Sequence, residues 1–212
     1  MVTSQTVDTW TGVPGFSEEW YRDIVEFAGR TPEPVRWFAA HFTEGSIVLL
    51  VLLFLLASGR RFGGTSRDRA ATLVAPVAVV LAYGLSEWIK TLVDQERPCR
   101  ALTDLVIVAG HCPPPGDWSF PSNHSTIAGA LAATTLLLRP RLGLLAVPLA
   151  LLAAFSRTFV GVHYPHDVVG GLLLGTLVGT VLLVTLSGPV AHLLDRRRTG
   201  PPAGTRTPTG AR

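Results

Sequence analysis

Charged side chains are scarce in this chain. Only 16% of its 212 residues are Asp, Glu, Lys or Arg, whereas 48% are hydrophobic. A soluble domain of this length carries more charge, and its apolar residues do not gather into long blocks as they do here. Lysine occurs once, and no basic stripe alternates with aromatic residues. The net charge of +3 therefore does not indicate a nucleic-acid partner, and the composition excludes an ordinary soluble domain.

Metal-binding patterns and a secretory leader are also missing. The chain has two cysteines, and it contains neither an HExxH motif nor a cluster of carboxylates. We therefore expect neither a metal site nor another cofactor. The N-terminal region lacks a basic stretch followed by an apolar one, so we expect no cleavable signal peptide.

The chain does contain five apolar blocks, each near the roughly 20 residues of helix that cross a bilayer. They predict an all-α fold, a polytopic membrane helical bundle of about five spanning helices. The expected spans are residues 35–57, 70–93, 122–138, 142–160 and 168–187. The third block is short. His41 and Glu44 interrupt the first block, so its outer turns are expected at the membrane interface.

The expected organisation has three parts: an N-terminal segment (1–33), a membrane-embedded domain (34–188) and a basic, disordered cytoplasmic tail (189–212). The N-terminal segment contains an amphipathic interfacial helix over residues 16–29. Apolar residues recur in it at helical spacing, and Ser17 is expected to cap it. They are Phe16, Trp20, Ile24 and Phe27. This helix could guide lipid towards a site, but a simple interfacial anchor is the favoured interpretation.

Arginines predict the orientation of the bundle. They gather in the turns at residues 60–69 and 139–141 and in the tail at 196–198. If all five blocks span the membrane, these places share one side, which the positive-inside rule makes cytoplasmic. The loop at residues 94–120 then faces outward. The preference for arginine over lysine is typical of a GC-rich bacterial genome, so we expect a bacterial plasma membrane.

Three glycines in the last block are spaced four residues apart, at Gly171, Gly175 and Gly179. Small residues at this spacing let another helix approach closely. A homodimer seam is one interpretation. Packing within the same bundle is the favoured one, because such faces serve both uses.

Three short motifs stand at the ends of apolar blocks and so on the outer face. They are Lys90-x6-Arg97-Pro98, Pro121-Ser122-Asn123-His124 and Ser156-Arg157-x5-His163-x3-Asp167. Each has an ordinary explanation when it is considered alone: a snorkelling lysine, a helix cap, a structural His–Asp pair. Charges at membrane depth are costly without a partner or a function, so their combination indicates a site.

The motif residues suit phosphate chemistry. Three cations can balance the charge of a phosphate group. One histidine that is oriented by an acid can act as a nucleophile, and a second histidine can donate a proton. In a membrane-embedded chain, this predicts an enzyme that acts on a lipid phosphate.

In these motifs the chain resembles the type 2 phosphatidic acid phosphatase superfamily, which also includes the vanadium haloperoxidases. The family pattern is K-x6-RP, PSGH and SR-x5-H-x3-D, and the resemblance covers about residues 70–175. It implies that His163 attacks phosphorus, Asp167 holds His163, and His124 protonates the leaving oxygen. It also implies a phosphate clamp, with no cofactor. The clamp would consist of Lys90, Arg97, Arg157, Ser122 and the backbone at Asn123 and His124.

Asn123 is the one departure, because the family pattern has glycine there. Asparagine tolerates left-handed backbone angles better than most residues, so we expect activity to be retained and the choice of leaving group to be tuned. His166 stands at a variable position and is expected on the surface. Cys99 and Cys112 share the outward loop, so we expect a disulfide between them in an oxidising space, with two reduced thiols as the alternative.

The expected function is hydrolysis of a lipid phosphate or diphosphate at the outer leaflet, through a phosphohistidine. Candidate substrates are undecaprenyl diphosphate, phosphatidylglycerol phosphate and phosphatidic acid. One alternative is a phosphotransferase that uses the same intermediate and an acceptor other than water. Another is a membrane scaffold without activity, which the intact motif residues disfavour.

Overall fold

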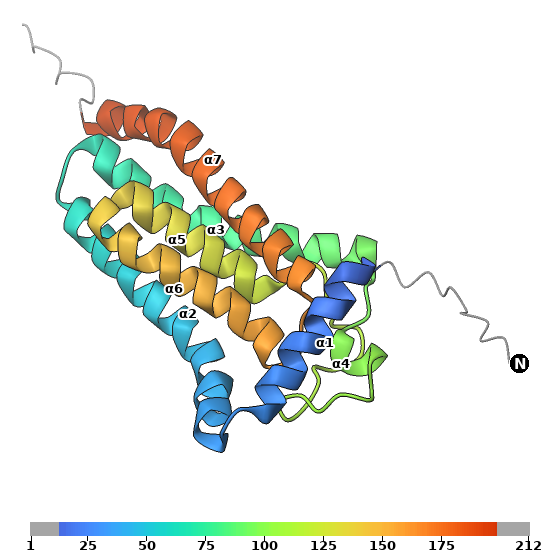
Figure 1. The fold of residues 1–212 in the computed structure, drawn as a ribbon. Coiled ribbons are helices and arrows are strands. Elements are labelled where there is room, and N and C mark those ends of the chain that lie inside the picture. The colour runs from blue at the N-terminus through green and yellow to red at the C-terminus, as the bar shows by residue number, and fades with distance from the viewer. Residues whose placement is uncertain (1–12, 199–212) are drawn as a thin grey trace, which may run out of the picture.

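The computed structural model describes residues 13–198, and this range is helical without strands (Figure 1). The expected all-α membrane helical bundle is confirmed. The helices are α1 (Gly15–Arg30), α2 (Glu33–Phe62), α3 (Ser66–Val93), α4 (Pro98–Ala101), α5 (Asn123–Leu138), α6 (Pro140–Phe159) and α7 (Pro165–Arg198). Residues 1–12 and 199–212, which include most of the expected disordered tail, lie outside the described range. The tail segment begins as helix, because α7 continues to Arg198.

Four of the helices, α2, α3, α6 and α7, are long and apolar enough to cross a membrane. The third expected span, α5, has 16 residues and lies among these longer helices (Figure 1). Most of its side chains are buried, and they are mainly small: Ala, Gly, Ser and Thr. Small residues permit close helix packing in a membrane, so α5 forms the centre of the bundle.

The glycine ridge of α7 packs against this central helix. A Cβ atom added at Gly175 would lie 1.9 Å from the Thr126 carbonyl oxygen, and one added at Gly171 would lie 2.4 Å from the Ser122 carbonyl oxygen. The two backbones therefore touch where glycine leaves room for them. The favoured interpretation of Gly171, Gly175 and Gly179, packing within the same bundle, is confirmed. The alternative of a homodimer seam on that face does not hold, because α5 of the same chain occupies it.

The two ends of the bundle differ in character. The α2–α3 connection, the α5–α6 connection and the end of α7 gather at one end, and they carry the arginine clusters (Figure 1). A capping box between Thr65 and Asp68 begins α3 at that end. The opposite end holds α1, α4 and the loop from α4 to α5, so the motif residues gather away from the arginine clusters.

Helix α1 has two different faces. Phe16, Trp20 and Phe27 are more than half exposed, as expected for an interfacial helix. Ser17 does not cap the helix, because Pro14 is the N-cap residue and Ser17 is fully buried. On the buried face, the Tyr21 hydroxyl donates a 2.9 Å hydrogen bond to the Gly161 carbonyl. Helix α1 therefore packs against the turn between α6 and α7 on one face and exposes apolar side chains on the other.

The loop between α4 and α5 is tied to the bundle at several points. The expected disulfide between Cys99 and Cys112 is confirmed, with the two Cα atoms 5.8 Å apart. The Ala109 amide donates to the Val160 carbonyl at 3.0 Å, and the Ser119 amide donates to the Gln95 carbonyl at 2.8 Å. These bonds hold the loop over the ends of α3, α6 and α7.

Candidate active site

His163 lies at the centre of the candidate site, in the turn between α6 and α7. Its side chain is 2% exposed. Nε2 lies 3.1 Å from Nη1 of Arg97, and Nδ1 lies 3.4 Å from Oδ2 of Asp167. The predicted contact between His163 and Asp167 is therefore present, and Nε2 of His163 faces Arg97.

Three donors hold the Asp167 carboxylate, which is fully buried. Gln95 Nε2 donates to Oδ1 at 2.9 Å, and the Tyr164 amide donates to Oδ2 at 2.9 Å. The Ser119 hydroxyl also donates to Oδ2, and its oxygen lies 3.4 Å from Nδ1 of His163. Sequence reasoning missed Gln95 and Ser119, because Gln95 stands at an unspecified position between Lys90 and Arg97 and Ser119 lies in the loop outside the motifs.

Lys90 and Arg97 converge, although they do not lie on one helix. Helix α3 ends at Val93, and Asp94 has left-handed backbone angles. Arg97 is instead the N-cap residue of α4. The chain turns back between them, so that Lys90 Nζ and Arg97 Nη2 each lie 2.9 Å from Oδ1 of Asp117.

Asp117 is another residue that sequence reasoning missed. Burial raises the pKa of its carboxyl group, but hydrogen bonds from Lys90 and Arg97 outweigh burial and hold this pKa below its usual value. The carboxylate is therefore charged, and one of its oxygens lies between the two cations. A phosphate oxygen that bound the same two donors would have to displace it.

Arg157 and His124 converge on a different carboxylate, Glu44 of α2. Arg157 Nη1 donates to Thr43 Oγ1 at 2.9 Å and to Glu44 Oε1 at 3.3 Å. His124 Nε2 lies 3.1 Å from the same Glu44 oxygen. Glu44, which interrupts the first apolar block, is a further site residue that the motifs did not include. An acid inside an apolar block was the available signal, since such a charge requires a partner.

Ser122 and Asn123 begin α5. Ser122 is the N-cap residue, and its hydroxyl accepts from the Ser125 amide at 3.5 Å, as predicted. Asn123 Oδ1 accepts a 2.8 Å bond from Ser86, and its amide nitrogen donates to Glu87. Asp94 is the only non-glycine residue with positive φ between residues 13 and 198. Asn123 therefore does not adopt left-handed backbone angles. The expectation that asparagine is tolerated here because it accepts such angles is wrong.

His166 is not the surface residue that its variable position suggested. Its Nδ1 lies 2.7 Å from the Ser17 hydroxyl, and its Nε2 lies 3.0 Å from Gln95 Oε1. Its ring stacks between Phe120 and Tyr164. Helix α1 covers this histidine, and that contact joins residues 149 positions apart. No local pattern could have predicted it.

The assembled site suits nucleophilic attack on a phosphate. Burial lowers the pKa of His163 well below its ordinary value, and the nearby cations Arg97, Arg157 and Lys90 lower it further. The imidazole is therefore neutral at neutral pH, with Nε2 available as a nucleophile. Within the described part of the chain, no group of three His, Cys, Asp or Glu side chains is arranged to hold a metal ion.

Comparison with known proteins points in the same direction. The sequence model of the PAP2 superfamily matches residues 71–188. A decaprenylphosphoryl-5-phosphoribose phosphatase from Mycobacterium tuberculosis is 36% identical over 68% of this chain and 74% of its own length. An undecaprenyl-diphosphatase from Sulfolobus acidocaldarius is 32% identical over 60% of this chain, and the match spans 61% of that relative. The chain is therefore related to lipid phosphatases.

A solved structure has the same fold. It is the transmembrane PAP2-type phosphatidylglycerolphosphate phosphatase from Bacillus subtilis, with a TM-score of 0.58 and 19% identity. The similarity covers 87% of this chain and 88% of that one. It shows that the chain has the helical fold of that membrane protein.

Proposed function

Because the chain belongs to the PAP2 superfamily, we propose that this membrane phosphatase removes phosphate from a polyprenyl lipid through a phosphohistidine intermediate. The relatives named above support a prenyl-linked substrate. Phosphatidylglycerol phosphate and phosphatidic acid are the competing substrates. The single observation that carries the proposal is the buried His163, with Asp167 and Ser119 near Nδ1 and Arg97 beside Nε2.

The reaction proceeds in two steps. In the first, Nε2 of His163 forms a bond to phosphorus while the bond from phosphorus to the leaving oxygen breaks. His124 gives its proton to that oxygen. In the second, water attacks the phosphohistidine, His124 takes a proton from the water, and inorganic phosphate leaves with His163 restored.

The clamp stabilises the charge on the transferring group. Lys90 and Arg97 bind phosphoryl oxygens in the place that Asp117 Oδ1 occupies in the structure. Arg157 approaches from α6. The three fixed cations can supply the positive charge that other phosphatases obtain from a metal, so the activity should not require one.

The orientation of the bundle supports an outer-leaflet substrate in a bacterial plasma membrane. The arginine clusters lie at the end of the bundle opposite the site (Figure 1). With that end in the cytoplasm, the site serves lipids on the outer side.

The test is phosphate release by purified protein in detergent, from a panel of prenyl and glycerolipid phosphates, with EDTA present. Wild-type protein should release phosphate, and vanadate should inhibit it. His163→Gln should abolish release, whereas His192→Gln, at an exposed position on α7, should not. Activity that disappears in EDTA and returns with a divalent ion would contradict metal independence. Full activity of His163→Gln would contradict the mechanism.

A further inference from the structure

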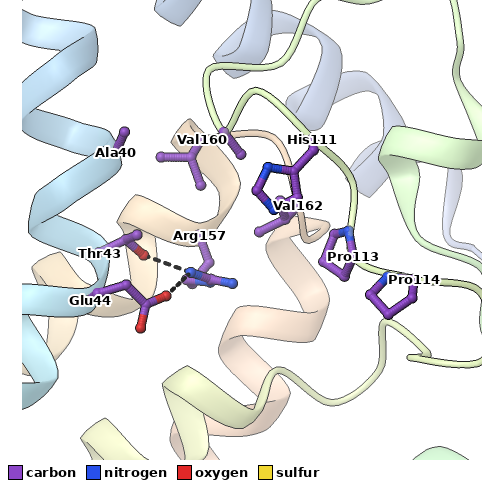
Figure 2. Close-up of a pocket in the computed structure, with 10 residues that line it drawn as sticks. Ala40, Thr43, Glu44, His111, Pro113, Pro114, Arg157, Val160 and Val162 are labelled. Atoms are coloured by element: carbon purple, nitrogen blue, oxygen red, sulfur yellow. Dashed lines mark hydrogen bonds and ion pairs between the residues drawn. The ribbon is translucent and has the colours of Figure 1, made fainter.

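A cavity of about 270 Å³ lies at the end of the bundle that carries the arginine clusters. It is bounded by the α2–α3 connection, the end of α5 and the second half of α7. It is separate from the cavity beside Arg157 and Glu44, which belongs to the candidate site (Figure 2). None of the described residues that line it belongs to a motif, so the proposed reaction does not use it.

One side of this cavity is apolar and connects the core with the membrane surface. Leu138 and Leu183 are almost fully buried in it, whereas Val184, which also lines it, is 64% exposed. Exposed apolar side chains on the long helices face the bilayer, because lipid is the solvent around a membrane bundle. The aliphatic chain of a lipid can therefore reach the floor of the cavity without leaving apolar surroundings.

The other side of the cavity is basic. Arg61 and Arg67 line it together with one acid, Asp68. The fold already occupies this acid, because Arg61 donates to Oδ1 and the amide and hydroxyl of Thr65 donate to Oδ2, at 3.2 and 2.8 Å. Arg67 is exposed, and no carboxylate within residues 13–198 forms an ion pair with it. The cavity therefore offers one positive charge in excess.

This combination selects an amphiphile with an anionic head. A soluble anion would pair with Arg67 but leave the leucine and valine walls uncovered. A zwitterionic lipid would cover those walls but bring no net charge to Arg67. Pockets that enclose a whole drug-sized ligand have about 300–1,000 Å³, so this cavity takes only part of a lipid, and the rest stays in the bilayer. Basic pockets between membrane helices bind the anionic heads of lipids in this way.

We propose that this cavity binds an anionic phospholipid of the surrounding leaflet, with its phosphate on Arg67 and an acyl chain against Leu183 and Val184. The lipid is not a substrate, because His163 lies at the opposite end of the bundle, and the site is independent of the proposed reaction. The bound lipid joins the α2–α3 connection to α7. A ligand that binds the folded state alone stabilises it, so this lipid should raise the Tm of the bundle.

The test is thermal unfolding of the purified full chain in a neutral detergent, with added phosphatidylglycerol or phosphatidylcholine of the same acyl chains. Phosphatidylglycerol should raise the Tm of the wild type at least about 3 °C more than phosphatidylcholine does. Arg67→Gln keeps a polar side chain but removes the charge, and it should abolish most of that difference. Arg141→Gln removes an exposed charge at the same end but outside the cavity, and it should keep the difference.

Three outcomes would overturn the proposal: no preference for phosphatidylglycerol in the wild type, an unchanged preference in Arg67→Gln, or an equal loss in Arg141→Gln. The last would indicate general attraction to the arginine clusters. Inorganic phosphate is the third ligand, and because it can also bind the candidate site, only a gain in Tm that Arg67→Gln removes is informative. Such a gain, equal to that from phosphatidylglycerol, would identify a site for soluble anions. Native mass spectrometry from an equimolar mixture of the two lipids is the second measurement, and phosphatidylglycerol should stay bound to the wild type but not to Arg67→Gln.

Discussion

At the residue scale, each cation of the candidate site has a carboxylate partner. Lys90 and Arg97 share Asp117, and Arg157 pairs with Glu44. Charges at this depth are costly when they stand alone, so the carboxylates stabilise the cations while no substrate is bound. A phosphate that binds the same donors must compete with them. The residues that stabilise the fold of the site therefore also weaken its affinity for anions.

Replacing Asp117 should strengthen anion binding. Asp117→Asn keeps the shape of the side chain but removes the charge that competes for Lys90 and Arg97. Since a hydrogen bond to a charged group contributes about 1.5–3 kcal/mol, the inhibition constants of vanadate and inorganic phosphate should fall roughly tenfold or more. Asp104→Asn changes an exposed acid of the same loop and should have no effect. Unchanged or weaker inhibition of Asp117→Asn would show that the carboxylate does not compete with phosphate.

The lowered pKa of His163 has a consequence for the pH profile. Protonation removes the lone pair that attacks phosphorus, and a lowered pKa delays protonation to more acidic solutions. The apparent pKa of the acid limb of kcat/KM should therefore lie below the ordinary pKa of histidine. The measurement is kcat/KM against pH with a substrate whose own ionisation is complete across the range. An acid limb at or above the ordinary value would contradict the buried, cation-flanked environment of His163.

His124 should matter in proportion to the difficulty of the leaving group. A general acid contributes ~10²–10⁴-fold. His124→Ala should therefore slow an alkyl phosphate by about this factor and slow p-nitrophenyl phosphate much less, because nitrophenolate leaves without a proton. The readout is the ratio of the two kcat/KM values. A uniform loss on both substrates would indicate that His124 binds phosphate instead of donating a proton.

At the element scale, helices α1 and α7 hold the turn that carries His163 in place. Helix α1 covers it, with the Tyr21 hydroxyl on the Gly161 carbonyl and the rings of Tyr21 and Tyr164 5.4 Å apart. Helix α7 begins directly after it and packs on α5 through its glycine ridge. The Ser122 amide donates to the Asp167 carbonyl at 3.0 Å, which joins the starts of α5 and α7. Disturbing either contact should move His163 relative to Arg97.

Gly175→Ala should destabilise the bundle even though alanine is the better helix former. The new methyl group would lie 1.9 Å from the Thr126 carbonyl oxygen, so α5 and α7 must separate. Overpacking of this kind costs about 1–3 kcal/mol, and it exceeds the gain of about 1 kcal/mol in helix propensity. Gly84→Ala, at an open position on α3, should be neutral or stabilising. Thermal unfolding in detergent measures both variants, and equal stability would contradict the close α5–α7 contact.

At the scale of the whole molecule, the arginine clusters and the candidate site lie at opposite ends of the bundle. The arginine-rich connections lie at one end, and the site, the disulfide and α1 lie at the other (Figure 1). An Arg at the membrane centre costs about 2.5–3.5 kcal/mol on the insertion scale, so such connections rarely cross. The exposed apolar side chains of the long helices face the bilayer between these ends.

Single cysteines test this orientation. In a variant with Cys99 and Cys112 replaced, Asp104→Cys should react with an impermeant thiol reagent in whole cells. Gly63→Cys, in the α2–α3 connection, should react only after lysis. The reverse pattern would place the site in the cytoplasm and remove the basis for an outer-leaflet substrate. Retained phosphatase activity in the cysteine-free parent is the control for folding.

The membrane character, the helical class, the disulfide and the identities of the motif residues could be predicted from the sequence. A chain that crosses a bilayer needs long apolar helices, and a phosphate site of this kind needs cations and histidines. Both requirements can be seen in the composition and in the residue spacing. Tertiary structure decided the rest. Glu44, Asp117 and Ser119 reach the site from segments without a motif, Gln95 comes from an unspecified position of the first motif, and α3 ends before Arg97. Which carboxylate neutralises which cation depends on how helices distant in the chain pack together, and no local pattern encodes that contact.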